Sequence, residues 1–136
     1  AESMRGKASV IDGDTIEIHG ERIRLHAIDS PEGRQSCTRG GAAWRCGTQA
    51  ARALDGSIDG ATVYCTARDV DRYGRIVATC RAHKVDIGDW MVRNGWALAY
   101  RQYGNDYVAA EQEARSARVG VWSGEVVPPW EWRRSQ

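Results

Sequence analysis

Lysine is scarce in this chain, and long apolar runs are missing. Lysine occurs only at Lys7 and Lys84, so nearly all of the 19 basic residues are arginines. Arginine suits bidentate phosphate contacts better than lysine does, although the base composition of a genome can produce the same bias. No apolar run approaches the ~20 residues that span a bilayer, which excludes a membrane-spanning segment. The net charge of +1 excludes a generally polycationic protein but leaves room for a local basic cleft.

Close cysteine pairs and a signal-peptide pattern are missing as well. The four cysteines contain no C-x-x-C pair, which argues against a zinc site. An even number of cysteines at wide spacing is typical of two disulfides and of an oxidising compartment, so we expect a secreted or periplasmic protein. Three pairings of the four cysteines are open at this point. No charged segment is followed by an apolar one, so we expect that no signal peptide remains, and the start at Ala1 suits a mature chain.

The patterning of apolar residues predicts strands first and helices later. The length of 136 residues, without repeats or linkers, predicts a single domain over 1–136. Alternating segments predict strands, and helical spacing bounded by caps predicts helices. The expected strands cover 7–11, 15–19, 22–27, 61–68 and 75–82, and the expected helices cover 42–58, a short segment after Asp86 and a last segment after Asn105. This arrangement predicts a small five-stranded β-barrel decorated by about three α-helices, in the α+β class.

The C-terminal segment combines prolines with tryptophans. Because proline interrupts helices, we expect residues 126–132 to be non-helical around Pro128 and Pro129. We expect Trp130 and Trp132 to cover the core rather than to bind a ligand.

Acidic residues gather around the first predicted hairpin. A two-residue turn at Gly20-Glu21 would place Asp14 opposite Ala27, at the end of the hairpin where Asp29 leaves the sheet. Glu32 follows shortly after, beyond a proline that stiffens the departing loop. We therefore expect three carboxylates, those of Asp14, Asp29 and Glu32, to converge.

Such a cluster of hard oxygen donors suits Ca²⁺ or Mg²⁺ better than zinc. An EF-hand is excluded, because Ile16 stands where the next ligand would be. The alternative is that these acidic residues belong to solvated turns, which favour the same residue types. Arg24 is open in the same way: it could lie opposite Glu17 as an exposed cross-strand pair, or point toward an anion site.

Six short motifs, in order, resemble the staphylococcal-nuclease-like (thermonuclease) family. The resemblance covers about residues 8–122, leaving a tail at 123–136. It rests on Asp12-Gly13-Asp14-Thr15, Arg24-Leu25, Ile28-Asp29-Ser30-Pro31-Glu32, Asp71-Arg72-Tyr73-Gly74-Arg75, Val92-Arg93-Asn94-Gly95 and Gly120-Val121-Trp122. It implies an OB-fold barrel and Ca²⁺-dependent hydrolysis of phosphodiesters in single- or double-stranded DNA and in RNA. Little sequence specificity, 3′-phosphate and 5′-hydroxyl products, and a monomer are expected.

The resemblance also implies roles for individual residues. Asp14 and Asp29 resemble the calcium carboxylates, and Ser30 stands where a backbone carbonyl contributes a further ligand. Glu32 resembles the general base, which activates the attacking water. Arg24 and Arg75 match the two arginines that hold the scissile phosphate.

Four further residues resemble the substrate contacts of the family. Tyr73 matches a tyrosine that touches a terminal phosphate, and Arg72 is its basic neighbour. Tyr100 and Tyr103 lie near the positions of tyrosines that contact a base, with a spacing that differs by about one residue. Packing in the core or at its rim is the alternative for both.

The cysteines are a departure from the family pattern. Cys65 and Cys80 would lie opposite each other in the second predicted hairpin, which favours a disulfide between them. Cys37 and Cys46 would then close a short loop beside Glu32.

Two non-catalytic functions are the alternatives to a nuclease: an OB-fold module that only binds nucleic acid, and a protein-interaction domain. Degenerate family members lose the metal aspartates or the arginines. All of these residues are present here, which favours catalysis.

Overall fold

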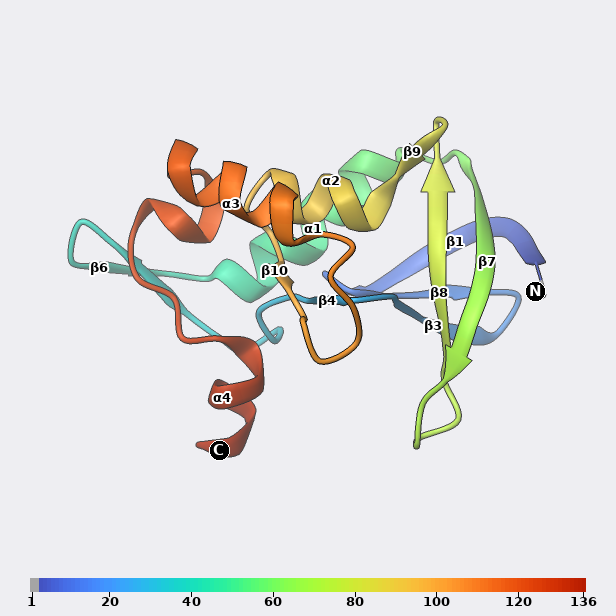
Figure 1. Ribbon diagram of the computed structural model, residues 1–136, viewed down its shortest axis with the longest axis horizontal. Coiled ribbons are helices and arrows are strands. Elements are labelled where there is room, and N and C mark those ends of the chain that lie inside the picture. Colours follow the sequence, from blue (N-terminus) through green and yellow to red (C-terminus); the bar gives the residue numbers. More distant parts are fainter. Residues whose placement is uncertain (1–2) are drawn as a thin grey trace.

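A computed structural model describes residues 3–136 and contains a closed five-stranded barrel with helices along one side (Figure 1). The sheet order is β3-β2-β1-β7-β8-β9, and a parallel pairing of β3 with β8 closes the barrel. This confirms the predicted OB-fold class. The barrel strands are β1 (Ser3–Asp12), β2 (Thr15–Ile18), β3 (Glu21–Leu25), β7 (Thr62–Val70) and β8 (Ile76–Ala82).

Within residues 3–136, four α-helices accompany the barrel, one more than expected. In Figure 1, α1, α2 and α3 lie together along one side, whereas α4 lies apart from them near the C-terminus. The helices are α1 (Cys46–Ile58), α2 (Ile87–Arg93), α3 (Val108–Ala117) and α4 (Pro129–Arg134), with a 3₁₀ turn η1 (Gly120–Ser123). Short strands join these elements: β4 (Ile28–Asp29), β5 (Cys37–Arg39), β6 (Ala42–Trp44), β9 (Val85–Asp86) and β10 (Leu98–Ala99).

The barrel interior is formed by alternate residues of its strands. Ile16, Ile23 and Leu25 point inward and are fully buried, as the alternation predicts. Leu54 of α1 and Met91 of α2 pack onto the same cluster. Burying a side chain of this kind contributes ~1.5–3 kcal/mol, so this core holds the elements that carry the site.

The first hairpin has a register different from the predicted one. Its two-residue turn is His19-Gly20, and both residues have positive φ (51° and 79°), as a turn matched to the twist of the strands requires. Thr15 therefore lies opposite Arg24, and Glu17 lies opposite Arg22. The shift is two residues, so each side chain keeps its face of the sheet but changes its partner.

Two predictions that depended on this register are wrong. Arg24 does not lie opposite Glu17, which forms an exposed ion pair with Arg22 at 3.7 Å. Asp14 lies beside Leu25 rather than Ala27, and its carbonyl accepts the Leu25 N–H at 2.8 Å.

The helix boundaries also differ in part from the predicted ones. The helix expected over 42–58 begins only at Cys46, because Ala42–Trp44 pairs with β5 as a strand. The cap at Asp86 is confirmed, since its side chain accepts the N–H groups of Gly88 and Asp89. Asn105 does not cap α3, which begins at Val108.

The expectation of a non-helical tail is wrong for its last part. Pro129 is the first residue of α4, where its missing N–H costs nothing and its fixed φ favours the helix. Trp130 packs against a second apolar cluster that contains the buried Leu98 and Val121, so this tryptophan does cover a core.

Both predicted disulfides are present. Cys65 and Cys80 lie opposite each other in β7 and β8, and Cys37 joins Cys46 across the β5–β6 hairpin. Two disulfides fit an oxidising compartment. Within residues 3–136, none of the helices has the length and apolar character required to cross a membrane.

Candidate active site

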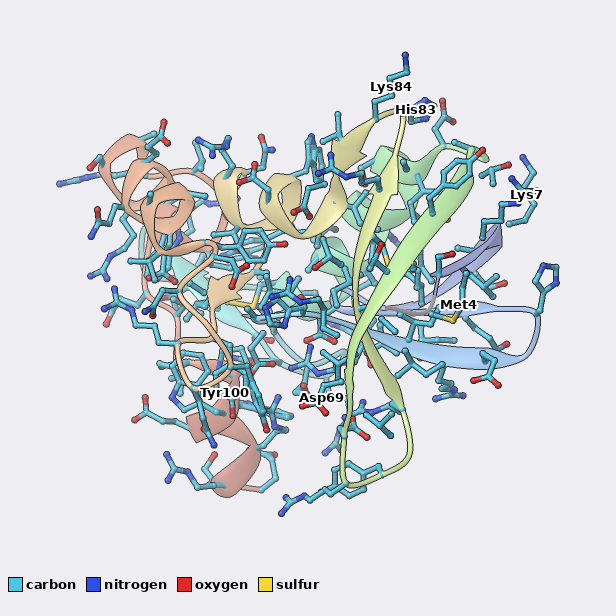
Figure 2. The ribbon with its side chains drawn as sticks, turned by 45° about the vertical axis from the view of Figure 1, so that its right-hand side comes forward. Met4, Lys7, Asp69, His83, Lys84 and Tyr100 are labelled. Carbon is cyan, nitrogen blue, oxygen red and sulfur yellow. A yellow bond between two sulfur atoms is a disulfide. The ribbon has the colours of Figure 1, made fainter. Side chains whose placement is uncertain are left out.

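A cavity of about 760 Å³ opens beside the barrel, between the β7–β8 hairpin and the C-terminal segment. Figure 2 shows two of its lining residues, Tyr100 beside α4 and Asp69 at the facing hairpin. Ten of the residues that line it carry charge or are tyrosines that the sequence singles out: Asp12, Asp14, Arg24, Glu32, Asp71, Arg72, Tyr73, Arg75, Tyr100 and Tyr103. Arg133, which had no predicted role, lines it as well.

Asp14 and Asp29 are brought together at one end of the first hairpin, as predicted. Asp29 is fully buried in β4, and the N–H of Ser30 donates to Asp14 Oδ2 at 2.9 Å. Gly13 permits this approach, because a Cβ at that position would collide with Ser30 Oγ. The structure therefore joins the two expected metal carboxylates and Ser30 in one unit.

β4 is held in place from the other side by a buried glutamate. Leu98 of β10 pairs with Asp29, and Ala99 donates its N–H to Glu111 Oε2 at 2.7 Å. Glu111 belongs to α3 and is buried, so α3 fixes the strand on which Asp29 lies. No role was predicted for Glu111 from the sequence.

Arg24 lies between the two aspartates. Its Nη1 is 3.1 Å from Asp14 Oδ2, and its Nη2 is 3.4 Å from Asp29 Oδ1. Burial lowers the pKa of Arg24, but Asp14 and Asp29 outweigh this effect and the net shift is upward. The arginine is therefore a permanent cation in the site, and of the two predictions for Arg24 the structure supports the one that directs it toward the site.

Arg133 of α4 contacts Asp29 and Glu32 at the same time. Its Nη2 donates to Asp29 Oδ2 at 2.8 Å, and its Nη1 donates to Asp29 Oδ1 at 3.1 Å and to Glu32 Oε2 at 2.9 Å. Asp29 has no exposed surface, whereas Arg133 retains 38% exposure. The C-terminal helix thus supplies a guanidinium to the carboxylates assigned to the metal and to the water.

The role of Arg133 was not predicted, because this residue lies 104 residues from Asp29 and outside the motifs of the family. A signal was present in the sequence. Pro129 can begin a helix, and the basic residues that follow would lie in its last turn.

Glu32 is oriented by a buried glutamine. The N–H of Glu32 donates to Gln35 Oε1 at 3.1 Å, and Gln35 Nε2 donates to the carbonyl of Val127 at 2.7 Å. Gln35 is fully buried, so it ties the Glu32 loop to the C-terminal segment. Gly47 allows α1 to approach this loop, since a Cβ there would collide with the Glu32 carbonyl.

Arg75 lies on the opposite side of the cavity, directly before β8. Its Nε donates to Asp71 Oδ2 at 2.7 Å, and its N–H donates to Asp71 Oδ1 at 2.9 Å. Although burial acts in the other direction, these bonds and the Tyr73 N–H hold the pKa of Asp71 below its ordinary value. Asp71 therefore stays ionised and fixes both Arg75 and the turn of the hairpin.

Arg72 and Tyr73 project from the tip of this hairpin. Tyr73 is 69% exposed, and the guanidinium groups of Arg72 and Arg75 lie 5.1 Å and 5.5 Å from its ring centre. Cation–π contacts of this geometry at an exposed position contribute ~0.5–1 kcal/mol. The hairpin therefore presents an aromatic ring and two positive charges to the mouth of the cavity.

Tyr100 and Tyr103 lie on the side of the cavity next to α4. Their rings meet edge to face at 4.9 Å, and Tyr100 stacks on Trp130 at 5.1 Å with planes 7° apart. Tyr103 is 55% exposed. One face of Tyr100 is thus covered by the tail, whereas Tyr103 is free to meet a ligand.

The carboxylates in this site repel one another. Burial, followed by Asp14 and Glu32, raises the pKa of Asp12 to about 6. Burial and Asp14 raise the pKa of Asp29 to about 6 as well, against the opposing effect of Arg133 and Arg24. Asp12, which had no predicted role in the site, therefore takes part in its electrostatics.

A hard cation fits the chemistry of this donor set, because the three carboxylates of Asp14, Asp29 and Glu32 outnumber the two arginines that contact them. In residues 3–136, as the side chains stand, no three acidic, histidine or cysteine side chains converge into a metal cluster. Both oxygens of Asp29 are instead bound by guanidinium groups. A cation held by Asp14 and Asp29 therefore requires Arg133 to release Asp29.

The barrel, the paired aspartates and the two arginines define an OB-fold protein with a site suited to an anionic substrate. The family model of the staphylococcal nuclease homologue matches residues 22–124, and the chain belongs to this family. The match runs from the third barrel strand, β3, to the end of η1.

The alignments with several relatives cover nearly the whole chain. It is 44% identical over 127 residues to the succinoglycan biosynthesis protein ExoI of Rhizobium meliloti, covering 90% of this chain and 66% of that protein. It is 40% identical over 132 residues to an uncharacterized endonuclease of Escherichia coli, covering 91% and 80%. It is 34% identical over 144 residues to a micrococcal nuclease of Shigella flexneri, covering 93% and 78%.

Proposed function

We propose that this protein is a Ca²⁺-dependent nuclease that hydrolyses phosphodiester bonds of DNA and RNA with little sequence specificity. The observation that carries this proposal is the grouping of Asp14 and Asp29 around Arg24, with Glu32 linked to Asp29 through Arg133, beside a cavity that Arg75 also lines. Membership in the family and the resemblance to an endonuclease and a micrococcal nuclease support it.

The cation would be held by the carboxylates of Asp14 and Asp29 and by the backbone carbonyl of Ser30. When bound, it neutralises the phosphodiester and stabilises the charge that builds on the phosphoryl oxygens. Asp14 is already oriented by the N–H of Ser30, whereas Asp29 would become available only after Arg133 releases it.

Arg24 and Arg75 would hold the phosphate from two sides. Both are arginines, whose planar groups bind phosphate oxygens through paired hydrogen bonds. Arg24 is fixed by the aspartates and Arg75 by Asp71, which keeps the two donors in place before substrate arrives. Preorganised donors of this kind are worth ~10²–10³ in rate.

Glu32 would accept the proton of the attacking water. Its backbone is fixed by Gln35, and its carboxylate lies at the edge of the cavity. Because the cut would break the bond to the 5′ oxygen, the products would be 3′-phosphate and 5′-hydroxyl ends.

Arg133 contacts both Glu32 and Asp29, and only the contact with Glu32 is compatible with a cation bound to Asp29. Release of Asp29 by Arg133 would free Oδ2 for the cation and leave Oδ1 with its 3.4 Å contact to Arg24, while the bond from Nη1 to Glu32 could remain. Arg133 would then hold Glu32 in position, and the guanidinium would remain beside the phosphate.

The exposed groups around the cavity would contact the rest of the substrate. Arg72 and Tyr73 at the hairpin tip suit a terminal phosphate, and Tyr103 suits stacking on a base. Stacking is tolerant of sequence, which fits a nuclease of low specificity. We propose that the protein acts as a monomer in a secreted or periplasmic location, where both disulfides persist.

One experiment tests the reaction, the cation and the base together. The protein is incubated with single- and double-stranded DNA and with RNA, in Ca²⁺ or in chelator, beside Glu32→Gln. The matched control is Glu21→Gln, an exposed glutamate at the start of β3 that is absent from the cavity wall. We expect Ca²⁺-dependent cleavage by the parent and by the control, and loss of cleavage in Glu32→Gln.

The product ends are checked by labelling with a polynucleotide kinase, which modifies 5′-hydroxyl ends without prior dephosphorylation. Absence of Ca²⁺-dependent cleavage, or full activity of Glu32→Gln, would contradict the proposal. Binding of nucleic acid without cleavage would instead support a non-catalytic OB-fold module.

A further inference from the structure

A second, smaller cavity of about 540 Å³ lies on the outer face of the barrel, away from the carboxylates. It is formed by three neighbouring strands, β1, β7 and β8, and Figure 2 shows Met4 on the strand at its edge. Its described lining residues are Ser3, Met4, Arg5, Tyr64, Cys65, Thr66, Arg68, Thr79 and Arg81. We call this surface the outer groove.

The register of the sheet explains how these side chains are grouped. Tyr64 lies opposite Arg5 on one side and opposite Arg81 on the other. Residues directly opposite each other in adjacent strands point to the same face, so the three form one row across the sheet. All three are exposed, and Tyr64 has 54% of its surface accessible.

A second row, two residues further along each strand, consists of hydroxyl side chains. Thr66 lies opposite Ser3 and opposite Thr79. Next to this row, Arg68 donates from Nη1 to Thr79 Oγ1 at 3.1 Å. The outer groove thus combines an aromatic ring, three guanidinium groups and three hydroxyl groups.

The charge of the outer groove is positive. None of its described lining residues is acidic, and Arg5 and Arg81 form no ion pair within residues 3–136. Arg68 approaches one carboxylate, Asp106, at 3.9 Å. For a chain of net charge +1, three arginines around one groove are a local excess of positive charge.

Arg68 connects the outer groove to the candidate active site, because it lines both cavities. It lies on β7 just before the hairpin that carries Arg72, Tyr73 and Arg75. A strand of nucleic acid that leaves the active site past this hairpin can therefore reach the outer groove without crossing the barrel.

We propose that the outer groove binds the flanking part of a single nucleic-acid strand whose scissile phosphate lies in the active site. Arg5 and Arg81 contact backbone phosphates, Tyr64 stacks on a base, and Arg68 spans the two cavities. Alternation of positive charge with an aromatic platform is the pattern by which proteins bind single strands without reading sequence. The inference rests on the proposed function for the position of the strand, but binding to the groove can be measured without hydrolysis.

The test is a pair of charge-matched double variants. Arg5→Gln/Arg81→Gln removes two positive charges from the outer groove. Arg52→Gln/Arg118→Gln removes two from exposed positions that line neither cavity. All four substituted arginines are exposed, so both variants should unfold at the same temperature as the parent. That result would show that neither variant is misfolded.

Binding is measured in chelator with single-stranded DNA of about 4 and about 16 nucleotides, the range that one OB-fold contacts. For the long strand we expect the groove variant to bind several-fold more weakly, with the slope of log K against log salt reduced by about 1.4, as loss of two phosphate contacts predicts. Binding of the short strand, and both measurements for the control, should be unchanged. Tyr64→Ala should weaken binding of the long strand by about tenfold, whereas Tyr64→Trp should leave its binding unchanged.

Equal effects in the groove and control variants, or an unchanged salt slope in the groove variant, would overturn the inference. The binding measurements do not require cleavage. An inactive parent protein would therefore contradict the proposed function, while the test of the outer groove would remain valid. If the parent does cleave, the groove variant should show a raised KM on the long strand and an unchanged kcat.

Discussion

Arg133 and Asp29 form a bidentate ion pair, with Nη2 2.8 Å from Oδ2 and Nη1 3.1 Å from Oδ1, although they lie 104 residues apart. The carboxylate is fully buried, and a third donor, Arg24, is 3.4 Å away. Asp29 cannot give these oxygens to a cation and to Arg133 at once. The C-terminal helix therefore provides an internal cation at the place where the proposed function requires Ca²⁺.

The first prediction concerns this competition. Arg133→Gln should bind Ca²⁺ about tenfold more tightly than the parent. A hydrogen bond to a charged group is worth ~1.5–3 kcal/mol, and the partial exposure of Arg133 places the effect at the lower end. Isothermal titration calorimetry measures it directly. Arg134→Gln, which removes the same charge from the neighbouring exposed residue, should change the affinity much less.

Removal of Arg133 should also alter stability in the absence of Ca²⁺. The variant leaves Asp29 buried with fewer positive partners, so its midpoint of thermal unfolding in chelator should fall below that of Arg134→Gln. Added Ca²⁺ should restore much of the difference, because the cation binds only the folded state. Unchanged or weaker Ca²⁺ binding in Arg133→Gln would show that Ca²⁺ and the Arg133 guanidinium do not compete for Asp29.

The second prediction concerns the stacking of Trp130 on Tyr100. An aromatic pair of this geometry contributes ~0.5–1.5 kcal/mol beyond its buried area, and here it anchors α4. Trp130→Ala should detach the tail, so that trypsin cleaves after Arg133 and Arg134 faster than in the parent. Trp132→Ala is the control, because the structure gives that ring no stacking partner among the described aromatic pairs.

Loosening of α4 should carry Arg133 away from Asp29. Trp130→Ala should therefore shift Ca²⁺ affinity in the same direction as Arg133→Gln. Limited proteolysis followed by mass spectrometry measures the release of the tail, and the calorimetric titration measures the change in Ca²⁺ affinity. Equal protection of the tail in both tryptophan variants would contradict the anchoring role.

The third prediction contrasts two arginines in β3. Arg24→Gln should lower kcat by ~10²–10³, because it removes a fixed donor from the proposed phosphate site. Arg22→Gln should change kcat little, since its exposed pair with Glu17 at 3.7 Å is worth ~0–1 kcal/mol. Rates on one oligonucleotide at saturating Ca²⁺ test both, and a similar loss in the two variants would exclude a specific role for Arg24.

Arg75→Gln completes this comparison from the other side of the cavity. It should also lower kcat by ~10²–10³, but with a smaller effect on unfolding than Arg24→Gln. The reason is burial: Arg24 compensates two buried aspartates, whereas Arg75 pairs with Asp71 on an exposed hairpin.

The elements that local patterns specify could be predicted from the sequence. Alternation in β2, β3, β7 and β8 fixes which residues face the core, and the pairing of Cys65 with Cys80 follows from that alternation. The convergence of Asp14 with Asp29 was also predictable, because both lie where the first hairpin ends. The hairpin register was not, since the turn could take His19-Gly20 or Gly20-Glu21 and both keep the same faces.

Contacts made by the C-terminal segment could not be predicted from local sequence patterns. The position of Arg133 follows from the way Gln35 and Trp130 hold the C-terminal segment, and neither contact has a local signature. Prolines suggested a non-helical tail, but proline is tolerated in the first turn of a helix, which is where Pro129 lies. The outer groove likewise appears only when β1, β7 and β8 are aligned.

The last prediction separates the two disulfides by what each one holds. Cys65→Ala/Cys80→Ala should lower the free energy of unfolding by about 3 kcal/mol, the value expected for a loop of 15 residues. Its effect on kcat should be small, since the bridge lies behind the outer face of the barrel. Cys37→Ala/Cys46→Ala should cost somewhat less stability, because its loop spans only nine residues. It should nevertheless lower kcat more, because Cys46 begins α1 and its neighbour Gly47 packs against Glu32. Denaturant unfolding and oligonucleotide cleavage measure the two quantities, and a larger loss of kcat in the Cys65/Cys80 variant would contradict this assignment.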